Sequence, residues 1–420
     1  MSKKKTILLH LPAYRDPELI PTIEDAIDKA KHPDRLRFGI CRQYHPEDGF
    51  DDLTKYKKDK RFKIYECLYT EAKGLPWARA IINEQLLEDE DYICQLDSHH
   101  RFVQDWDETL IEMHQELEKK GYKPIIAGYS PLYDPFNDPA GRSMEPWQSQ
   151  FVCFYPHGTI FIRPGLLHGY ENMTEPVMSR FLCGHFDFAR SEWAREIKHD
   201  PDIYFSGEEI NLTVRSYTHG YDFFHPHKII VWHSTMREER SGKLKWDDDA
   251  KLGVDWHNKQ EYARRKIRCL FGVEEGIDLT GYDLGTVRTL REYEKYAGVN
   301  FKTRSVQKYT LDNGYPPNPP IENDEMWEKS FMQSFYHLVT IHRRDFPRDN
   351  YKHILVAFDD IEGKSVNSKF ITGHQLEMFI KKGTPIHYEE YFLTDRKPTK
   401  LVFWGYTEEE GWVERIEHGI

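Results

Sequence analysis

An acid and a histidine directly follow an apolar segment of the sequence. The segment 91–96 has the composition of a buried strand, and it leads into Asp97 and His99, which are two positions apart. Side chains at positions i and i+2 of an extended segment point to the same side. A carboxylate oxygen and an imidazole nitrogen in that arrangement could hold one divalent cation together. The structural alternative is a polar turn after a strand, since so short a motif often recurs by chance.

Two later segments offer further groups for the same site. The apolar run 229–233 ends on His233, which would add a third protein ligand and leave coordination positions open. Glu208 and Glu209 follow Gly207 and begin a predicted helix. Acids in a first helical turn are also favoured by the helix dipole alone, so capping remains an alternative to a role at a bound substrate.

Alternating strands and helices are expected to position these side chains. Strands are predicted at 6–11, 36–41, 62–67 and 91–96, with helices at 18–30 and 77–87. This alternation predicts a doubly wound, mostly parallel sheet of the α/β class, and such sheets bind ligands beyond the carboxyl ends of their strands. Further strands are predicted at 123–129, 157–163 and 229–232, further helices at 208–220 and 258–270, and a long loop at 131–156.

The clearest domain boundary is a proline-rich segment. Four prolines fall within residues 316–320, which is typical of a stiff linker. We predict a first domain at 1–311 (core 6–240, helical extension 241–311), a linker at 312–324 and a small β-rich domain at 325–420. Strands at 353–358, 385–392 and 400–406 support the last of these, whose role the sequence does not indicate.

The composition limits the function classes. A chain of 420 residues suggests two or three domains, and 30% charged and 39% apolar residues are typical of a globular protein. The net charge of -12 disfavours a protein that wraps nucleic acid by general electrostatics. The six cysteines form no Cys-x-x-Cys pair, which argues against a zinc cluster. With no long apolar run and no signal segment evident, we expect no membrane partner and a cytoplasmic location.

Taken together, the motifs resemble a known enzyme family. They are Leu75–Arg79, Tyr92–Asp107, Phe205–Ile210 and His219–Pro226, closing on His233. Over residues 6–240 their order and spacing resemble the cytoplasmic polypeptide α-N-acetylglucosaminyltransferases that modify hydroxyproline on Skp1, with bacterial and viral relatives. Asp-Ser-His, a Gly-Glu helix and a later histidine are more distantly similar to the polypeptide N-acetylgalactosaminyltransferases. The C-terminal domain has no counterpart in this resemblance.

The resemblance implies a GT-A fold, a UDP-sugar donor, Mn²⁺ or Mg²⁺, and retention of configuration at the anomeric carbon. It further implies N-acetylglucosamine as the favoured sugar and a protein side-chain hydroxyl as the acceptor. Position by position, it assigns Asp97, His99 and His233 to the metal, and Glu208 and Glu209 to the reacting sugar. It assigns to the UDP-sugar the residues Pro12, Ala13, Tyr14, Arg15, Arg42, Arg79, Asp97 and Ser98. An arginine fork suits a diphosphate, although a surface salt bridge is an equal alternative for Arg42.

Several alternatives stay open at the level of the sequence. An inverting transferase would need a carboxylate as general base, and Glu209 could serve. The acceptor could be a modified DNA base, although the acidic net charge disfavours nucleic acid. A metal-dependent phosphoester hydrolase or a nucleotide-binding module would use a similar Asp/His cluster. The sequence does not indicate the oligomeric state.

Overall fold

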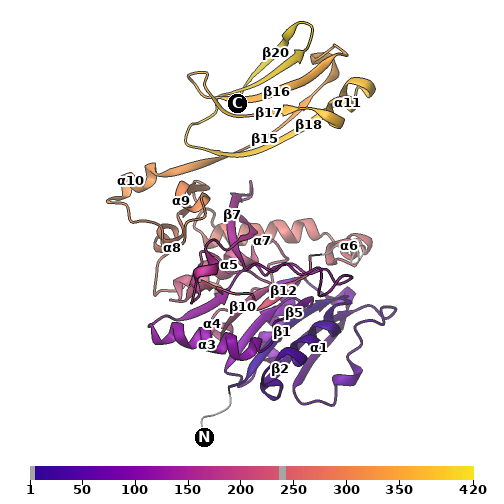
Figure 1. Ribbon diagram of the computed structural model, residues 1–420, viewed down its shortest axis with the longest axis vertical. Coiled ribbons are helices and arrows are strands. Elements are labelled where there is room, and N and C mark those ends of the chain that lie inside the picture. Colours follow the sequence, from indigo (N-terminus) through magenta and orange to yellow (C-terminus); the bar gives the residue numbers. More distant parts are fainter. Residues whose placement is uncertain (1–4, 236–242) are drawn as a thin grey trace. The chain divides into compact units, whose positions relative to one another are not determined.

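The computed structural model describes residues 5–235 and 243–420. The chain divides into two compact units, which Figure 1 colours along the sequence. The first holds the residues up to Lys302 together with Tyr309–Pro320, and the second holds Thr303–Lys308 and Ile321–Ile420. The segment 312–324, expected as a linker, is thus divided between the two units. The expected boundary between core and helical extension, at residues 240 and 241, lies outside the described residues.

The first unit is built on an eight-stranded sheet with the order β3-β2-β1-β4-β10-β6-β11-β9. Four neighbouring pairs are parallel, whereas β10 and β9 run antiparallel to their neighbours. The strands are β1 (Ile7–Tyr14), β2 (Leu36–Tyr44), β3 (Phe62–Leu68), β4 (Tyr92–Leu96), β6 (Pro124–Ala127), β9 (Val177–Met178), β10 (Phe186–Arg190) and β11 (Asp222–His225). The prediction of a mostly parallel α/β sheet is confirmed, although β9, β10 and β11 were not foreseen.

Helices cover both faces of this sheet. On one face, α1 (Leu19–Lys29) and α3 (Trp106–Lys119) contribute apolar side chains to a core shared with alternate residues of β1 and β4. Leu8 points to the opposite face, where α2 (Leu75–Ile81) and its π-helical continuation lie. There, α4 (Ser191–Glu196) packs against β4 and β10. The remaining helices before residue 312 are α5 (Glu208–Thr218), α6 (Lys245–Lys251), α7 (Trp256–Leu270), α8 (Leu290–Ala297) and α9 (Lys308–Leu311).

Two small ribbons complete the first unit. The short strands β5 (His100–Phe102) and β12 (Val231–His233) pair antiparallel, which sets His233 opposite His100. The strands β7 (Trp147–Phe154) and β8 (Ile160–Leu166) form a hairpin. The prediction of a continuous loop over 131–156 is therefore wrong in its second half. The strand there was not recognised because Gln148, Ser149 and Gln150 are polar and interrupt any apolar run. The first unit also contains the two-residue strand β13 (Val299–Asn300).

The second unit is largely β-structure, as the sequence indicated. Its strands are β14 (Ser305–Gln307), β15 (Phe331–Ile341), β16 (Tyr351–Asp359), β17 (Ser365–Ile371), β18 (Ile386–Thr394), β19 (Lys400–Thr407) and β20 (Gly411–Gly419), with helices α10 (Asp324–Lys329) and α11 (Gly373–Lys382). Its core contains Ile354 and Val356 of β16, together with Leu376 and Phe379 of α11. Among the described residues of the whole chain, the helices are all too short or too polar to cross a bilayer.

The burial of the sheet core predicts a contrast between two phenylalanines. Phe188 in β10 is fully buried and its ring lies 5.1 Å from that of Tyr92, whereas Phe136 is 73% exposed. We expect Phe188→Ala to lower the free energy of unfolding by about 3–5 kcal/mol, because it removes apolar burial and leaves a cavity. The same change at Phe136 should cost at most about 0.5 kcal/mol. Urea unfolding of the two variants measures both values, and equal losses would contradict the assignment of the core.

Candidate active site

Three side chains meet at the carboxyl end of β4. Asp97 directly follows this strand, and the pairing of β5 with β12 brings His233 alongside. The Oδ2 atom of Asp97 lies 3.6 Å from Nε2 of His99 and 3.4 Å from Nε2 of His233. One ligand atom from each residue lies within 4.8 Å of the others. The structure thus brings together the three residues expected to hold a metal ion, while their role as ligands stays a prediction.

Asp16 fixes the orientation of the His99 ring. Its Oδ2 lies 2.7 Å from Nδ1 of His99 and also accepts a hydrogen bond of 2.6 Å from the hydroxyl of Ser98. A proton held on Nδ1 by this carboxylate leaves Nε2 free to bind a cation. The sequence interpretation missed this role of Asp16. The available signal was the parallel order of the strands, because neighbours β1 and β4 end at the same edge of the sheet.

His233 is oriented by neighbouring imidazole rings. The His185 ring stacks on it at 4.2 Å between centroids and 14° between planes, and the His100 ring lies at 4.9 Å. Nε2 of His233 is buried and makes no hydrogen bond of standard geometry, although Oδ2 of Asp97 lies 3.4 Å away. Burial lowers the pKa of His233 to about 3, so the ring is neutral, as a metal ligand must be. A neutral imidazole nitrogen that faces a carboxylate oxygen fits a cation site. The contribution of His185 was not foreseen from the sequence.

Arg79 links Asp97 to Glu208 beneath this cluster. Its side chain is fully buried and donates hydrogen bonds of 3.0 Å to Asp97 and 2.6 Å to Glu208. Burial alone would raise the pKa of Asp97, but His233, His99 and Arg79 together hold it well below its usual range. Asp97 is therefore a carboxylate at neutral pH. The prediction that Arg79 contacts a diphosphate stays a prediction, since the structure shows its guanidinium engaged by two acids.

The two acids that begin α5 differ in their ionisation. Burial would raise the pKa of Glu208, but Arg79 and His199 keep it below its usual value. Glu209 is partly exposed and accepts a hydrogen bond of 3.1 Å from the backbone N–H of Gly184. Burial, with the charge of Glu208 nearby, raises its pKa to about 7. Glu209 can therefore both accept and donate a proton near neutral pH.

The position of α5 depends on a glycine. Gly207 has a φ of 96°, and a Cβ atom there would lie 2.1 Å from Cδ1 of Ile267. A larger residue would strain the backbone and displace the first turn of the helix, together with both acids.

Five of the residues expected at the UDP-sugar lie in or directly after β1 and β2. Pro12 and Ala13 are within β1, followed by Tyr14 and Arg15. Tyr14 donates to Asp248 at 2.9 Å, and Arg15 forms ion pairs of 2.7 Å with Asp48 and Asp248. Arg42 pairs with Asp51 and Glu66, each at 2.7 Å. Their contact with a nucleotide stays a prediction.

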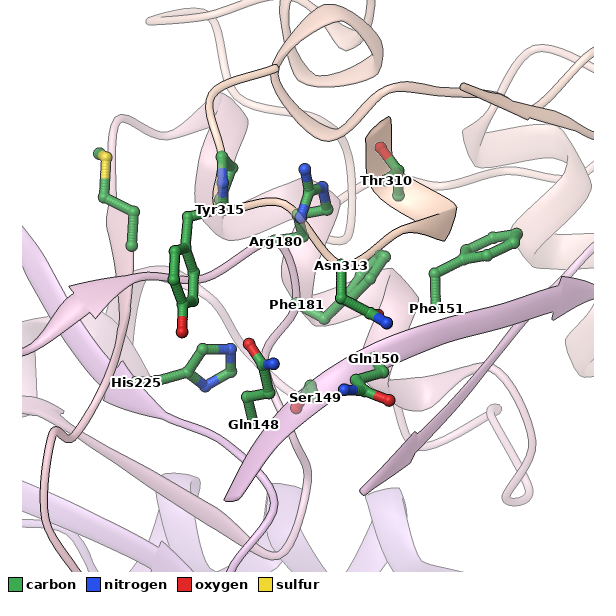
Figure 2. A pocket seen from close by; sticks show the side chains of 12 residues that line it. Gln148, Ser149, Gln150, Phe151, Arg180, Phe181, His225, Thr310, Asn313 and Tyr315 are labelled. Carbon is green, nitrogen blue, oxygen red and sulfur yellow. The ribbon is translucent and has the colours of Figure 1, made fainter. Parts of the chain in front are cut away.

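A separate pocket lies along β7 (Figure 2). Gln148, Gln150 and Tyr315 are among its lining residues, whereas the three residues of the cation cluster are not. Arg180, which also lines it, donates to the backbone oxygen of Ala297 at 3.0 Å and to that of Gly314. The bond to Gly314 connects the segment 309–320 to the rest of the first unit.

Comparisons with known proteins agree with this geometry. The model of a family described as "Glycosyltransferase (GlcNAc)" matches residues 6–64 and 49–303. A crystal structure of GalNAc-T7 with UDP, GalNAc and Mn²⁺ matches with a TM-score of 0.53 and 12% identity, covering 99% of this chain and 72% of that chain. At this identity the likeness shows the fold alone, which is GT-A. A search of curated protein sequences gave no match.

The raised pKa of Glu209 predicts a pH-dependent stability. Its pKa rises on folding from 4.5 to about 7. Between these values the folded chain binds the extra proton, so the free energy of unfolding falls as the pH rises. Glu209→Gln removes this effect. Between pH 5 and pH 8 we expect the free energy of unfolding of the wild type to fall by about 1–3 kcal/mol relative to that of the variant. Urea unfolding at both pH values measures this, and a pH-independent difference would contradict the assignment.

The stacked ring of His185 predicts an effect on cation binding. We expect His185→Ala to weaken the binding of Mn²⁺ by about 10-fold or more, because His233 loses the surface that fixes its plane. His185→Phe keeps a flat ring and should lose less than the alanine variant. Isothermal titration with MnCl₂ provides the readout, with circular dichroism as the check on folding. Equal affinities for the two variants would show that stacking does not orient His233.

Proposed function

The chain belongs to the glycosyltransferase (GlcNAc) family, and on that premise we propose that it is a metal-dependent, retaining enzyme that moves N-acetylglucosamine from UDP-N-acetylglucosamine to a hydroxyl group. The favoured acceptor is a protein side chain, and the favoured location is the cytoplasm, both on the resemblance of the sequence. One observation carries the proposal: Asp97, His99 and His233 converge at the carboxyl end of β4.

The donor set fits Mn²⁺. One carboxylate and two imidazoles combine hard and borderline donors, which favours a first-row cation such as Mn²⁺ over Mg²⁺. Three protein ligands would leave coordination positions open for the diphosphate of a donor. When bound, such a cation supplies Lewis-acid neutralisation of the charge that develops on the UDP leaving group. The related GalNAc-T7 structure, which contains UDP and Mn²⁺, supports this choice.

Neighbouring residues determine the orientation and ionisation of the proposed metal ligands. Asp16 fixes the proton of His99 on Nδ1, and Arg79 helps His233 and His99 to keep Asp97 ionised. We assign to Arg79 a positioning role, since its guanidinium touches both Asp97 and Glu208. Pro12, Ala13, Tyr14, Arg15, Arg42 and Ser98 are proposed to hold the donor at the ends of β1, β2 and β4.

Glu208 and Glu209 are proposed to act next to the reacting sugar. Glu208 is ionised and held by Arg79, so it suits a fixed hydrogen bond to a sugar hydroxyl. Glu209 is partly exposed and suits contact with the acceptor hydroxyl. With no unambiguous nucleophile, we favour attack by the acceptor on the face from which UDP departs, which retains the anomeric configuration.

The pKa of Glu209 favours one competing mechanism. A carboxylate with a pKa of about 7 is well suited to remove a proton from an acceptor hydroxyl. If Glu209 acts in this way from the face opposite UDP, the enzyme inverts the configuration. The same fold and the same cation site serve both mechanisms, so the configuration of the product decides between them.

Turnover of nucleotide sugars tests the function. With Mn²⁺ present, we expect UDP release to be fastest from UDP-N-acetylglucosamine among UDP-N-acetylglucosamine, UDP-N-acetylgalactosamine and UDP-glucose, and to stop with EDTA. Asp97→Ala should lower the rate by more than about 100-fold, since it removes a proposed metal ligand, and Asp16→Asn by about 10–100-fold. In the absence of an acceptor the sugar is transferred to water, and proton NMR early in the reaction should show the α-anomer of N-acetylglucosamine first, whereas the β-anomer first supports the inverting mechanism.

The control is an aspartate of the same unit that lies outside the site. Asp89 is exposed, and Asp89→Ala should leave UDP release unchanged. Wild-type turnover by Asp97→Ala would overturn the site assignment. Absence of UDP release from all three donors, in chain that is folded and loaded with Mn²⁺, would overturn the proposed donor class.

A further inference from the structure

The second unit carries aromatic rings on one face of its sheet. The sheet has the strand order β17-β16-β19-β20, and Ile354 and Val356 point into the core of the unit. The alternate positions therefore face outward. The pairing of the strands sets His353 opposite Tyr406, and Tyr406 opposite Trp412. We call His353, Phe370, Trp404, Tyr406 and Trp412 the aromatic patch.

The rings of this patch touch one another. His353 and Tyr406 are stacked, with centroids 4.7 Å apart and an angle of 2° between planes. Trp412 meets both of them edge to face, at 5.5 Å and 5.2 Å, and Phe370 meets His353 edge to face at 4.7 Å. Trp404 lies 4.8 Å from Trp412. Five rings thus form one continuous surface across four strands.

Two of these rings remain open to solvent. Phe370 is 56% exposed and Trp412 is 40% exposed. Cross-strand pairing stabilises a sheet and explains the stacked pair of His353 and Tyr406. It does not explain why large apolar rings beside that pair face water. Contiguous exposed rings of this kind mark binding surfaces rather than structural ones.

The charges around the patch select the chemistry of the ligand. Lys352, which is next to His353 in the chain, pairs with Glu408. Arg415 covers Trp404 and pairs with Glu417 at 2.7 Å. Nucleic acids and anionic membranes need cations that are not neutralised by the protein itself. Flat rings with paired charges at their border instead suit a neutral ligand that has both an apolar face and hydroxyl groups.

We propose that the aromatic patch is a binding surface for a neutral oligosaccharide. A pyranose ring presents a face of C–H bonds, which packs on an aromatic ring, and a rim of hydroxyl groups, which bonds to polar side chains. Arg415, which covers Trp404, and its partner Glu417 offer a donor and an acceptor for such hydroxyls. The chain is a glycosyltransferase, so glycans are among the molecules that it handles. The inference goes beyond the proposed function and does not depend on the metal site.

Isothermal titration of the full-length chain tests this surface. The probes are chitohexaose, cellohexaose and mannohexaose, titrated in EDTA so that a metal site cannot contribute. We expect at least one hexasaccharide to bind. Trp412→Ala should weaken that binding by at least 10-fold, whereas Trp412→Tyr, which keeps a flat ring with a polar tip, should weaken it less. The matched control is Ile361→Ala, a change at an 85% exposed apolar residue of the same unit outside the patch, which should leave the affinity unchanged.

Three results would overturn the proposal. They are no binding of any of the three hexasaccharides at millimolar concentration, equal binding by wild type and Trp412→Ala, and binding of a dT12 oligonucleotide at the patch in place of the sugars. Circular dichroism confirms that the variants are folded. Failure of UDP release has no bearing on this result, because the titration contains neither a donor nor a metal ion.

Discussion

The fully buried guanidinium of Arg79 is the interaction on which the site depends. It lies between Asp97 and Glu208 and joins the end of β4 to the start of α5. A buried charge is tolerated only where partners compensate for its lost hydration. The dependence is mutual, because without Arg79 the two carboxylates would face each other with no cation between them. The ionised form of Asp97 thus rests on Arg79 together with the neighbouring His233 and His99, which lower its pKa.

The order of the strands determines which residues can meet at this point. Because β1 and β4 are parallel neighbours, Asp16 and His99 emerge at one edge of the sheet. His233 reaches the same place through a separate ribbon, β5 with β12. Each side chain thus comes from the end of a different element. This agrees with the general tendency of α/β sheets to bind ligands beyond the carboxyl ends of their strands.

Much of this arrangement follows from local patterns in the sequence. Apolar runs predicted β1, β2, β3 and β4, and the spacing of Asp97 and His99 indicated a shared direction. The strand β10 escaped prediction because it is short and carries the buried acid Asp187, which is stabilised by Gln95, a partner far away in the sequence. The stacking of His185 on His233 likewise depends on tertiary packing. Such contacts are determined by the tertiary fold, and no periodic pattern in the sequence reveals them.

The two units differ in the physical basis of recognition. In the first, charges are buried and held by fixed partners, which strengthens electrostatic interactions and favours a reaction whose charge changes along its course. In the second, open rings and neutralised charges offer contacts that are individually weak and exchange readily. The two units are parts of one chain. If the aromatic patch holds a glycan, this connection raises the local concentration of that glycan around the first unit. Weak binding is then an advantage, because a tightly held sugar would leave too slowly for repeated transfer.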